Sequence, residues 1–325
     1  MKEIPAVQTL HNMLILRGEG SLGDAILSSA CYREIKKANP QIKITVACFG
    51  SAYGYFLHFP YVDEVFKLPV HRVLRPNQRW VSLIWAALKL RRRHFDLVLD
   101  SCYKPFWNWR LFKKIVGGGE RVLDNYTSPV QPFGAPSAHA SEHEVAILKL
   151  LGIAHPNPAY ELPVPADTQQ AVEQWLTQQK LSRYILFNPA GSVAARSFRA
   201  DTLREICAVA RRLQLPFVVP AMASRVQQLQ KIFADEKDVF VKQTAHVFEL
   251  FELVRRSAAV LTPDTAVVHI ASGFEKPTLA FYNTLSAYNA PHNPQAVLLE
   301  TDPADINTFD WWQLEKRIDE LQKWL

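Results

Sequence analysis

The stretch Met13-Leu-Ile-Leu-Arg-Gly-Glu-Gly-Ser-Leu-Gly-Asp24 joins a short apolar run, a glycine-rich turn and the start of a helical segment. The four apolar residues Met13–Leu16 predict a strand that is buried on both faces. The residues that follow, Ala25–Ala38, predict an amphipathic helix. A strand that leads through a glycine turn into a helix is typical of α/β units, so this stretch predicts a parallel sheet covered by helices.

The same alternation of apolar runs and helical patterns continues along the chain, which predicts an α/β fold throughout. In the first half the predicted strands are Met13–Leu16, Ile44–Ala47, Val65–Leu68, Leu97–Leu99 and Arg121–Leu123, and the predicted helices are Ala25–Ala38, Val81–Arg92 and Glu142–Leu151. In the second half the predicted strands are Tyr184–Asn188, Phe217–Val219, Val239–Val241, Ala259–Leu261, Thr278–Phe281 and Ala296–Leu299, and the predicted helices are Thr168–Gln179, Asp201–Leu213, Arg225–Phe233, His246–Arg255, Ala266–Gly273 and Asp310–Leu325.

A proline-rich connector separates the two halves. Four prolines occur between residues 156 and 165. Proline fixes φ and removes a backbone donor, so the segment favours an extended conformation. With 325 residues the chain is long enough for two domains of ordinary size. We therefore predict an N-terminal domain over residues 1–158 and a C-terminal domain over residues 159–325.

The charge of the chain is unevenly distributed. The formal net charge is +6, but residues 1–155 carry +8 and residues 156–325 carry −2; residues 65–121 alone carry +10. This asymmetry predicts an acidic partner for the first half, such as nucleic acid, an anionic membrane surface or a phosphorylated glycan. No apolar run reaches the ~18–20 residues of a membrane span, and no secretory signal is evident, so we expect a cytoplasmic protein.

The spacing Gly18-x-Gly20-x-x-Gly23 is that of a dinucleotide-binding turn. Two features argue against such a site. The second predicted strand runs into Gly50 without the carboxylate that would bind a ribose. Asp24 also stands where a pyrophosphate would lie, and a carboxylate there repels phosphate. Asp24 instead has two compatible interpretations, a helix cap or a general base at the mouth of the sheet.

Two loops of the second half have features of an anion site. The first, Phe187-Asn-Pro-Ala-Gly-Ser192-Val-Ala-Ala-Arg196-Ser-Phe-Arg199, offers backbone N–H groups and two guanidinium groups to an anion. The alternative is a solvated turn with two surface arginines. The second, Pro263-Asp-Thr-Ala-Val-Val-His269, predicts a helix start. Thr265 and His269 are four residues apart and share one helix face, so both can contact a ligand phosphate at the helix N-terminus. The alternative is a capped helix with a buried histidine.

Three segments, taken in order, resemble the signatures of the heptosyltransferase family, glycosyltransferase family 9. They are Ser21-Leu-Gly-Asp24, Pro263-Asp-Thr-Ala-Val-Val-His269 and the trailing Gly273-Phe-Glu-Lys-Pro-Thr278. The resemblance covers nearly the whole chain. It implies the GT-B architecture, an α/β fold of two Rossmann-like domains with parallel sheets facing across a cleft. It also implies inverting transfer of heptose from ADP-heptose to the Kdo–lipid A inner core of lipopolysaccharide, without a metal or other cofactor, at the cytoplasmic face of the inner membrane.

The resemblance also implies roles for individual residues. Asp24 is the expected general base. The expected donor-binding residues are Ser192, Arg196, Asp264, Thr265, Ala266 and His269, and the expected acceptor-binding residues are Ser21, Gly23, Arg72, Arg75 and Arg79. The last three belong to the basic segment, which an acidic glycolipid acceptor and an anionic membrane surface would both suit. Arg196 stands where the family usually has lysine, and Ala266 where it commonly has glycine.

Other classes of protein stay open. No carboxylate follows Phe217–Pro220 closely enough to bind the nucleotide ribose, so a different nucleotide-sugar donor is an alternative. A nucleotide-sugar-binding protein without catalysis is a second alternative. Nucleic acid is not expected as a partner, because no nucleic-acid motif accompanies the basic segment. No metal site is expected, because the sequence has no Asp-x-Asp motif and its four cysteines are widely spaced.

Overall fold

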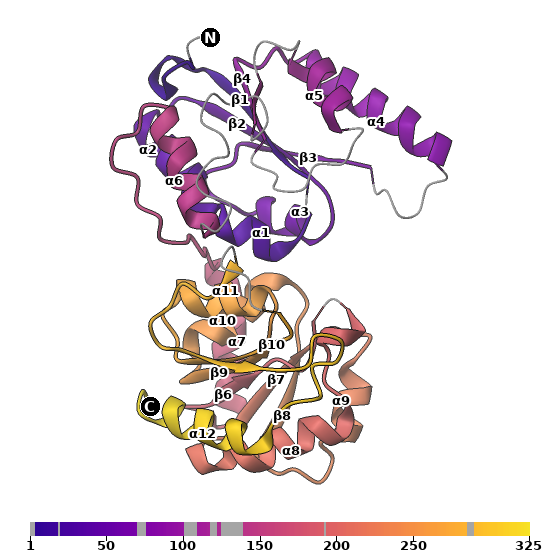
Figure 1. Cartoon of the computed structure of the whole chain (residues 1–325), viewed down its shortest axis with the longest axis vertical. Helices are drawn as coiled ribbons and strands as arrows, with labels where there is room; N and C mark the ends of the chain where they lie inside the picture. The colour runs from indigo at the N-terminus through magenta and orange to yellow at the C-terminus, as the bar shows by residue number, and fades with distance from the viewer. Residues whose placement is uncertain are drawn as a thin grey trace. The chain divides into compact units, whose positions relative to one another are not determined.

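The computed structural model describes residues 4–18, 20–69, 76–100, 109–117, 122–124, 139–191, 193–284 and 289–325. The chain divides into two compact units, Met1–Glu161 and Leu162–Leu325, which we call unit 1 and unit 2 (Figure 1). The domain boundary predicted between residues 158 and 159 lies just before this division. Each unit contains one parallel β-sheet with helices packed on it, so the prediction of two parallel-sheet α/β domains is confirmed.

Unit 1 has a five-stranded parallel sheet in the order β3-β2-β1-β4-β5. The chain builds β1, β2 and β3 outward in one direction and then returns to place β4 on the other side of β1. Open α/β sheets bind ligands at such a switch point, beyond the carboxyl ends of the strands. The strands are β1 (Asn12–Arg17), β2 (Lys43–Cys48), β3 (Glu64–Lys67), β4 (Leu97–Asp100) and β5 (Val122–Asp124), and the helices are α1 (Leu22–Leu27), α2 (Ser29–Ala38), α3 (Ser51–Phe56), α4 (Pro76–Arg91), α5 (Trp109–Gly117) and α6 (Ala140–Leu150).

Unit 2 has a six-stranded parallel sheet in the order β11-β10-β9-β6-β7-β8. Its switch point lies between β6 and β9. The strands are β6 (Ile185–Phe187), β7 (Phe217–Ala221), β8 (Val239–Gln243), β9 (Ala259–Pro263), β10 (Thr278–Tyr282) and β11 (Ala296–Glu300), and the helices are α7 (Ala166–Gln178), α8 (Ala200–Ala210), α9 (Val226–Ile232), α10 (Val247–Arg256), α11 (Ala266–Gly273) and α12 (Trp311–Gln322). Three short 3₁₀ segments complete the described elements, η1 (Val7–Thr9) in unit 1, and η2 (Ala194–Arg196) and η3 (Arg211–Leu213) in unit 2.

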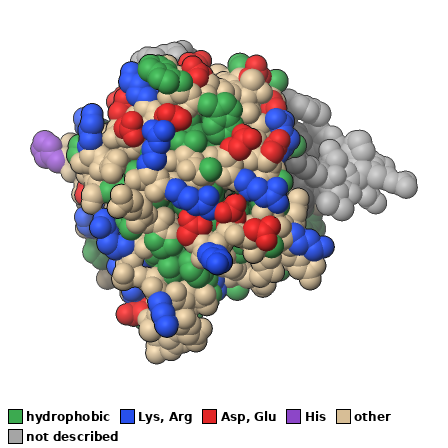
Figure 2. Space-filling view, turned by 90° about the horizontal axis from the view of Figure 1, so that it is seen from below, with side chains coloured by type: hydrophobic (Ala, Val, Ile, Leu, Met, Phe, Trp, Pro, Cys, Tyr) green, Lys and Arg blue, Asp and Glu red, His purple; other side chains and the backbone are tan. Residues whose placement is uncertain are grey.

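The C-terminal helix α12 packs on unit 2, a point that its sequence pattern left open. Leu314, Ile318 and Leu321 are fully buried in the same cluster as strand residues of the unit 2 sheet. Beside this stripe, Glu315 of α12 forms an ion pair with Arg212 of η3. Basic and acidic side chains are interspersed on the face drawn in Figure 2. This mixture accords with the near-neutral charge of the second half of the sequence.

One predicted helix is wrong. The segment Ala25–Ala38 forms two helices, α1 and α2, which meet at Ser28. The Ser28 hydroxyl donates to the carbonyl of Ala25 at 3.1 Å, and such local bonds compete with the regular helix ladder. The sequence pattern also missed α5 and α3, of which α3, with six residues, is too short to show a clear helical period.

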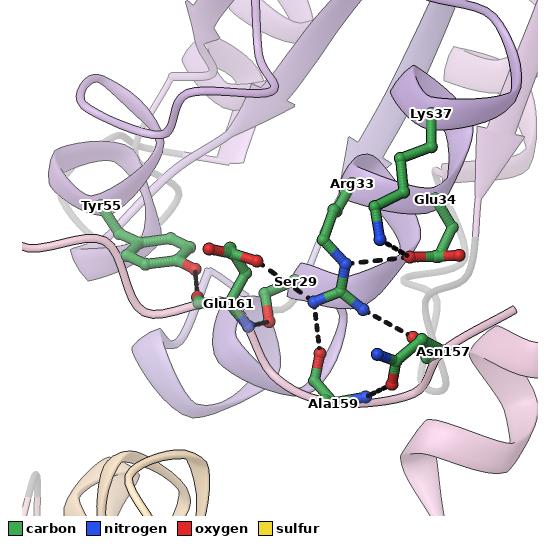
Figure 3. Close-up of polar contacts among 8 residues, drawn as sticks. All are labelled: Ser29, Arg33, Glu34, Lys37, Tyr55, Asn157, Ala159 and Glu161. Atoms are coloured by element: carbon green, nitrogen blue, oxygen red, sulfur yellow. Dashed lines mark hydrogen bonds and ion pairs between the residues drawn. The ribbon is translucent and has the colours of Figure 1, made fainter.

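The proline-rich connector is held on unit 1 by helix α2 up to Glu161 (Figure 3). The Arg33 guanidinium donates to the carbonyls of Asn157 at 2.7 Å and Ala159 at 2.8 Å, and it lies 3.1 Å from a carboxylate oxygen of Glu161. The Ser29 hydroxyl accepts from the Glu161 N–H at 2.8 Å. Residues 156–165 form neither helix nor strand, and the connector is bonded to unit 1 as far as Glu161.

Candidate functional site

In unit 2, residues from two separate loops meet at the sheet's switch point. Asn188 directly follows β6, and Asp264 and Thr265 directly follow β9. These two strands are neighbours in the sheet, so their carboxyl ends lie at one edge. This edge is where an α/β sheet of this topology binds its ligand. The structure thus brings together Arg196, Asp264, Thr265 and Ala266, four of the predicted donor-binding residues.

Arg196 and Asp264 form an ion pair at this edge. The Arg196 Nη1 atom lies 3.3 Å from the Asp264 Oδ2 atom and also donates to the Asp264 carbonyl at 3.2 Å. Asp264 is buried, whereas 41% of the Arg196 side chain is exposed. Burial raises the pKa of the Asp264 carboxyl above its usual value, and the nearby guanidinium partly opposes that rise. Asp264 therefore fixes a cation whose outer side stays accessible to a ligand.

Thr265 caps helix α11 and joins a small network of neutral polar groups. Its hydroxyl accepts from the Val267 N–H at 3.2 Å and from the Asn188 side-chain amide at 3.1 Å. The same amide donates to the Thr262 hydroxyl at 3.0 Å. The first N–H group of the helix, that of Ala266, has no partner within the helix, and such groups bind anions well.

Asn188 is not among the site residues predicted from the sequence, although it links both loops of the edge. Its position was the available signal, because it is the first polar residue after the central strand β6. Thr262 was missed for a different reason. It lies one residue past the predicted strand Ala259–Leu261 but inside the observed β9, and only the structure shows that its hydroxyl is buried beside Asn188.

The loop that carries Arg196 is tightly closed at Gly191. The Gly191 N–H donates to the Arg196 carbonyl at 2.6 Å. A Cβ atom at Gly191 would lie 2.7 Å from the Arg196 Cβ atom and 3.2 Å from the Thr265 methyl group. Glycine at this position therefore allows the loop to approach the start of α11. Ser192, the next predicted donor-binding residue, lies outside the described residues.

His269 lies on α11, one turn after Thr265, and is buried. This placement agrees both with a buried structural histidine and with a side chain on the ligand-facing stripe of the helix. The donor-binding role of His269 therefore stays a prediction.

In unit 1, the predicted residues Ser21, Gly23 and Asp24 lie at the start of α1, directly after β1. Ser21 is the N-cap: its hydroxyl accepts from the Asp24 N–H at 3.1 Å and in turn contacts the Asp24 carboxylate. The interpretation of Asp24 as the cap itself is therefore wrong, because the carboxylate lies in the first turn. The helix start and the Ser21 hydroxyl together hold this partly exposed carboxylate at the edge of the sheet.

The glycine-rich turn before Asp24 is explained by packing within unit 1. Gly20 has a φ of +68°, and a Cβ atom there would lie 2.6 Å from the Phe49 ring and 2.9 Å from the Phe49 carbonyl. Gly50, with a φ of +64°, faces the carbonyl of Gly20 in the same way. The glycines thus let the turns after β1 and β2 touch, which requires no dinucleotide.

Two buried ion pairs, neither of them predicted from the sequence, flank the switch point of unit 1. Arg17, at the end of β1, lies 3.5 Å from the carboxylate of Glu144 on α6, and it also donates to the Asp24 carbonyl at 2.8 Å. Asp100, at the end of β4, lies 2.9 Å from the ammonium of Lys113 on α5. A charged residue at the end of each apolar strand was the available signal. The partners lie far away in the sequence.

The structure describes none of the side chains of the three arginines predicted to bind the acceptor. Arg72 and Arg75 lie outside the described residues. Arg79 belongs to helix α4, and its side chain also lies outside what the structure describes.

Metal-ligating side chains do not cluster in the described parts of the chain, where no three His, Cys, Asp or Glu residues meet. Cys31, Cys48 and Cys207 are buried and form no disulfide, and burial raises the pKa of each thiol. The described helices also include none that is both long enough and apolar enough to cross a bilayer.

Comparison with known proteins gives consistent matches. The family model for glycosyltransferase family 9 (heptosyltransferase) matches residues 125–307. A protein of Escherichia coli (strain K12), provisionally named lipopolysaccharide heptosyltransferase 4, is 24% identical over 294 residues, which cover 84% of this chain and 74% of that protein.

Two solved structures have the same fold over nearly the whole chain. The family 9 glycosyltransferase from Veillonella parvula DSM 2008 matches with a TM-score of 0.76 and 14% identity, covering 99% of both chains. The heptosyltransferase WaaC of Escherichia coli, solved with ADP, matches with a TM-score of 0.67 and 14% identity, covering 95% of this chain and 99% of that one. The predicted two-domain fold class is thereby confirmed.

Proposed function

The chain belongs to glycosyltransferase family 9 and is a glycosyltransferase, and we propose that it transfers a heptose from ADP-heptose to the Kdo–lipid A inner core of lipopolysaccharide, with inversion and without a metal. One observation carries the proposal: Arg196 and the N-terminus of α11 meet at the switch point of unit 2. This is a site for a diphosphate whose charge the protein itself neutralises.

Unit 2 is the donor side of the proposed reaction. When the bond between the sugar and the diphosphate breaks, negative charge develops on the leaving phosphate. The Arg196 guanidinium and the Ala266 N–H group at the helix start are positioned to stabilise that charge, the role that a metal has in other transferases. Asp264 holds Arg196 in place and, by the family resemblance, contacts the donor sugar. Ser192 and His269 complete the proposed donor site.

Unit 1 is the acceptor side. The Asp24 carboxylate takes the proton from an acceptor hydroxyl, and the hydroxyl oxygen forms a bond to the anomeric carbon on the face opposite the diphosphate. The bond to the phosphate oxygen breaks with its electron pair, ADP leaves, and the configuration inverts. General base catalysis of this kind contributes about 10²–10⁴-fold to a rate. Ser21 and Gly23, at the start of α1, and the basic residues Arg72, Arg75 and Arg79 bind the acceptor, the arginines through its acidic groups.

The proposed site of action is the cytoplasmic face of the inner membrane, where the protein would be peripheral. The proposed acceptor is a lipid, so the enzyme must work at a bilayer surface. The strongly basic segment of unit 1 supports this location, because anionic lipid attracts clustered lysine and arginine.

A different nucleotide-sugar donor is the second candidate, and one observation favours it. Strand β7 ends at Ala221, and the residues that follow, Met222-Ala-Ser-Arg225, contain no carboxylate to bind a ribose. Donor selection must therefore rest on other contacts than a carboxylate at this position.

The reaction is tested by mass spectrometry of a truncated lipopolysaccharide acceptor after incubation with ADP-heptose and, separately, with other nucleotide sugars. We expect the mass of one heptose to be added from ADP-heptose, equally well when divalent metals are chelated. NMR of the product should show an inverted anomeric centre. Transfer from another donor in place of ADP-heptose would establish the second candidate, and no transfer from any donor would contradict the proposed function.

A further inference from the structure

Helix α4 of unit 1 is apolar on two opposite faces. One face packs against the sheet of unit 1 and contains Leu83, Ala86, Ala87 and Leu90, each almost completely buried. A helix at the surface of a globular protein usually has polar residues on its other face.

The other face of α4 instead carries Val81, Ile84, Trp85 and Leu88. The spacing of these residues puts them on one stripe of the helix. Their exposed fractions are 70%, 38%, 57% and 48%, so four large apolar side chains in a row face solvent. Single exposed apolar residues are common, but a contiguous stripe of them marks a surface that binds a partner.

Basic side chains flank this apolar stripe. Lys89, Arg91 and Arg92 are exposed at the end of α4, and the Lys89 ammonium lies 3.6 Å from the centroid of the Trp85 ring. Arg91 donates to the Ile115 carbonyl of α5 at 3.0 Å, which ties the two helices together. Residues 76–95 contain no Asp or Glu. The surface therefore combines exposed apolar side chains with positive charges, and residues 76–95 add no negative charge.

We propose that the exposed stripe of α4, Val81, Ile84, Trp85 and Leu88 with the cations beside it, is the surface that docks this protein on an anionic phospholipid bilayer. Apolar and aromatic side chains of such a helix enter the boundary between headgroups and acyl chains, while lysine and arginine contact the headgroups. A second copy of the chain fits less well, because pairing two such faces would bring like charges together.

The docking surface stands on observations that do not involve the transferase site. Its purpose, which is to bring unit 1 to an acceptor embedded in a membrane, rests on the proposed function. The helix would lie in the plane of the interface and would not cross the bilayer, since none of the described helices is suited to do so.

The test is sedimentation of the full chain with vesicles of phosphatidylethanolamine and phosphatidylglycerol. We expect the wild type to bind and binding to weaken as salt is added. Replacing Ile84→Ser and Trp85→Ser together should weaken binding by about tenfold or more, because two exposed apolar anchors are lost. The matched control is Trp312→Ser, which removes a tryptophan with 63% exposure from α12 of unit 2 and should leave binding unchanged.

A second variant, Lys89→Glu with Arg92→Glu, tests the charge component on side chains that are exposed and do not pack in the core. It should lose most of its binding to the anionic vesicles. Failure of the wild type to bind, or equal binding by both α4 variants and the wild type, would overturn the docking proposal. So would a wild-type dimer that the Ile84 and Trp85 substitutions dissociate.

Transfer to a water-soluble fragment of the acceptor, measured on the same proteins, separates this proposal from the proposed function. The α4 variants should retain that transfer while losing vesicle binding. If the wild type binds vesicles but transfers no sugar to the fragment, the proposed function fails and the docking surface stands.

Discussion

Units 1 and 2 place different chemistry at the same point of similar sheets. In each sheet the first strand is central and the fourth strand of that unit packs beside it, so both have a switch point there. Unit 1 buries full charges at this edge, Arg17 with Glu144 and Asp100 with Lys113, and presents the carboxylate of Asp24. Unit 2 has a network of amide and hydroxyl groups and presents the cation of Arg196.

The difference shows that the fold sets the place of a site and that a few side chains set its chemistry. A presented carboxylate suits proton removal, and a presented guanidinium beside a helix N-terminus suits a phosphate. Substitutions at one edge should therefore change catalysis and leave donor binding intact, and substitutions at the other edge should do the reverse.

The largest effect is expected for Asp24→Asn. Because amide nitrogen and oxygen cannot take the acceptor proton, turnover should fall by about 10²–10⁴-fold. The affinity for ADP, measured by calorimetry, should stay within about twofold, since the residue contacts no donor group in this account. Turnover at the wild-type level would remove Asp24 from the chemistry.

Glu144→Ala tests the buried charges of unit 1. Loss of the carboxylate leaves the buried Arg17 guanidinium without this partner, which costs about 3–5 kcal/mol for a buried pair. Urea denaturation should show a destabilisation of that order. The control Glu320→Ala removes a partly exposed ion pair with Arg317 in unit 2 and should cost under about 1 kcal/mol. Equal costs at the two positions would contradict the structural role of the Arg17 pair.

Arg196→Ala is the counterpart of Asp24→Asn at the edge of unit 2. A hydrogen bond to a charged group is worth about 1.5–3 kcal/mol, so ADP should bind about 10- to 150-fold more weakly. Calorimetric titration provides the measurement. Unchanged ADP affinity would show that the diphosphate binds elsewhere.

Gly191→Ala asks whether the close approach of the Arg196 loop matters. The added methyl group would meet the Arg196 Cβ atom and carbonyl, and such overpacking costs about 1–3 kcal/mol. Both stability and ADP affinity should fall. The control is Gly54→Ala in α3, where a Cβ atom meets nothing within 4 Å and the helix should gain about 0.5–1 kcal/mol. A neutral Gly191→Ala variant would argue against a closed loop.

Asp264→Asn should have the smallest effect on stability, a slight increase whose size depends on pH. Burial raises the pKa of this carboxyl in the folded state, so its ionised form destabilises the fold at neutral pH. That penalty disappears as pH falls through the folded pKa toward the unfolded value. The variant should therefore melt slightly higher than wild type at neutral pH, with the difference shrinking in acid. A lower melting temperature at neutral pH would contradict this sign.

The sequence predicted the strands well because parallel strands covered on both faces are continuous apolar runs. It also predicted α11 with the bounds that the structure has, since Thr265 provides a cap and Gly273 lies at the end. The prediction failed at Ser28, where a side-chain hydrogen bond to the backbone competes with the regular helix. It also failed at α3, which is too short to show a helical period.

The candidate site was predictable where its residues are close in the sequence and not where they are far apart. Asp264 and Thr265 share one loop, and Ser21 and Asp24 share one turn. Arg17 and Glu144 are 127 positions apart, and Asn188 and Thr265 are 77 apart, so only the folded sheet reveals these contacts.

The most direct test of the division between the two edges is hydrogen–deuterium exchange of the full chain with and without saturating ADP. We expect slower exchange in residues 189–199 and 264–270, around Arg196 and the start of α11, and unchanged exchange in residues 18–27. Slower exchange in residues 18–27 with no change at the two segments of unit 2 would contradict this division.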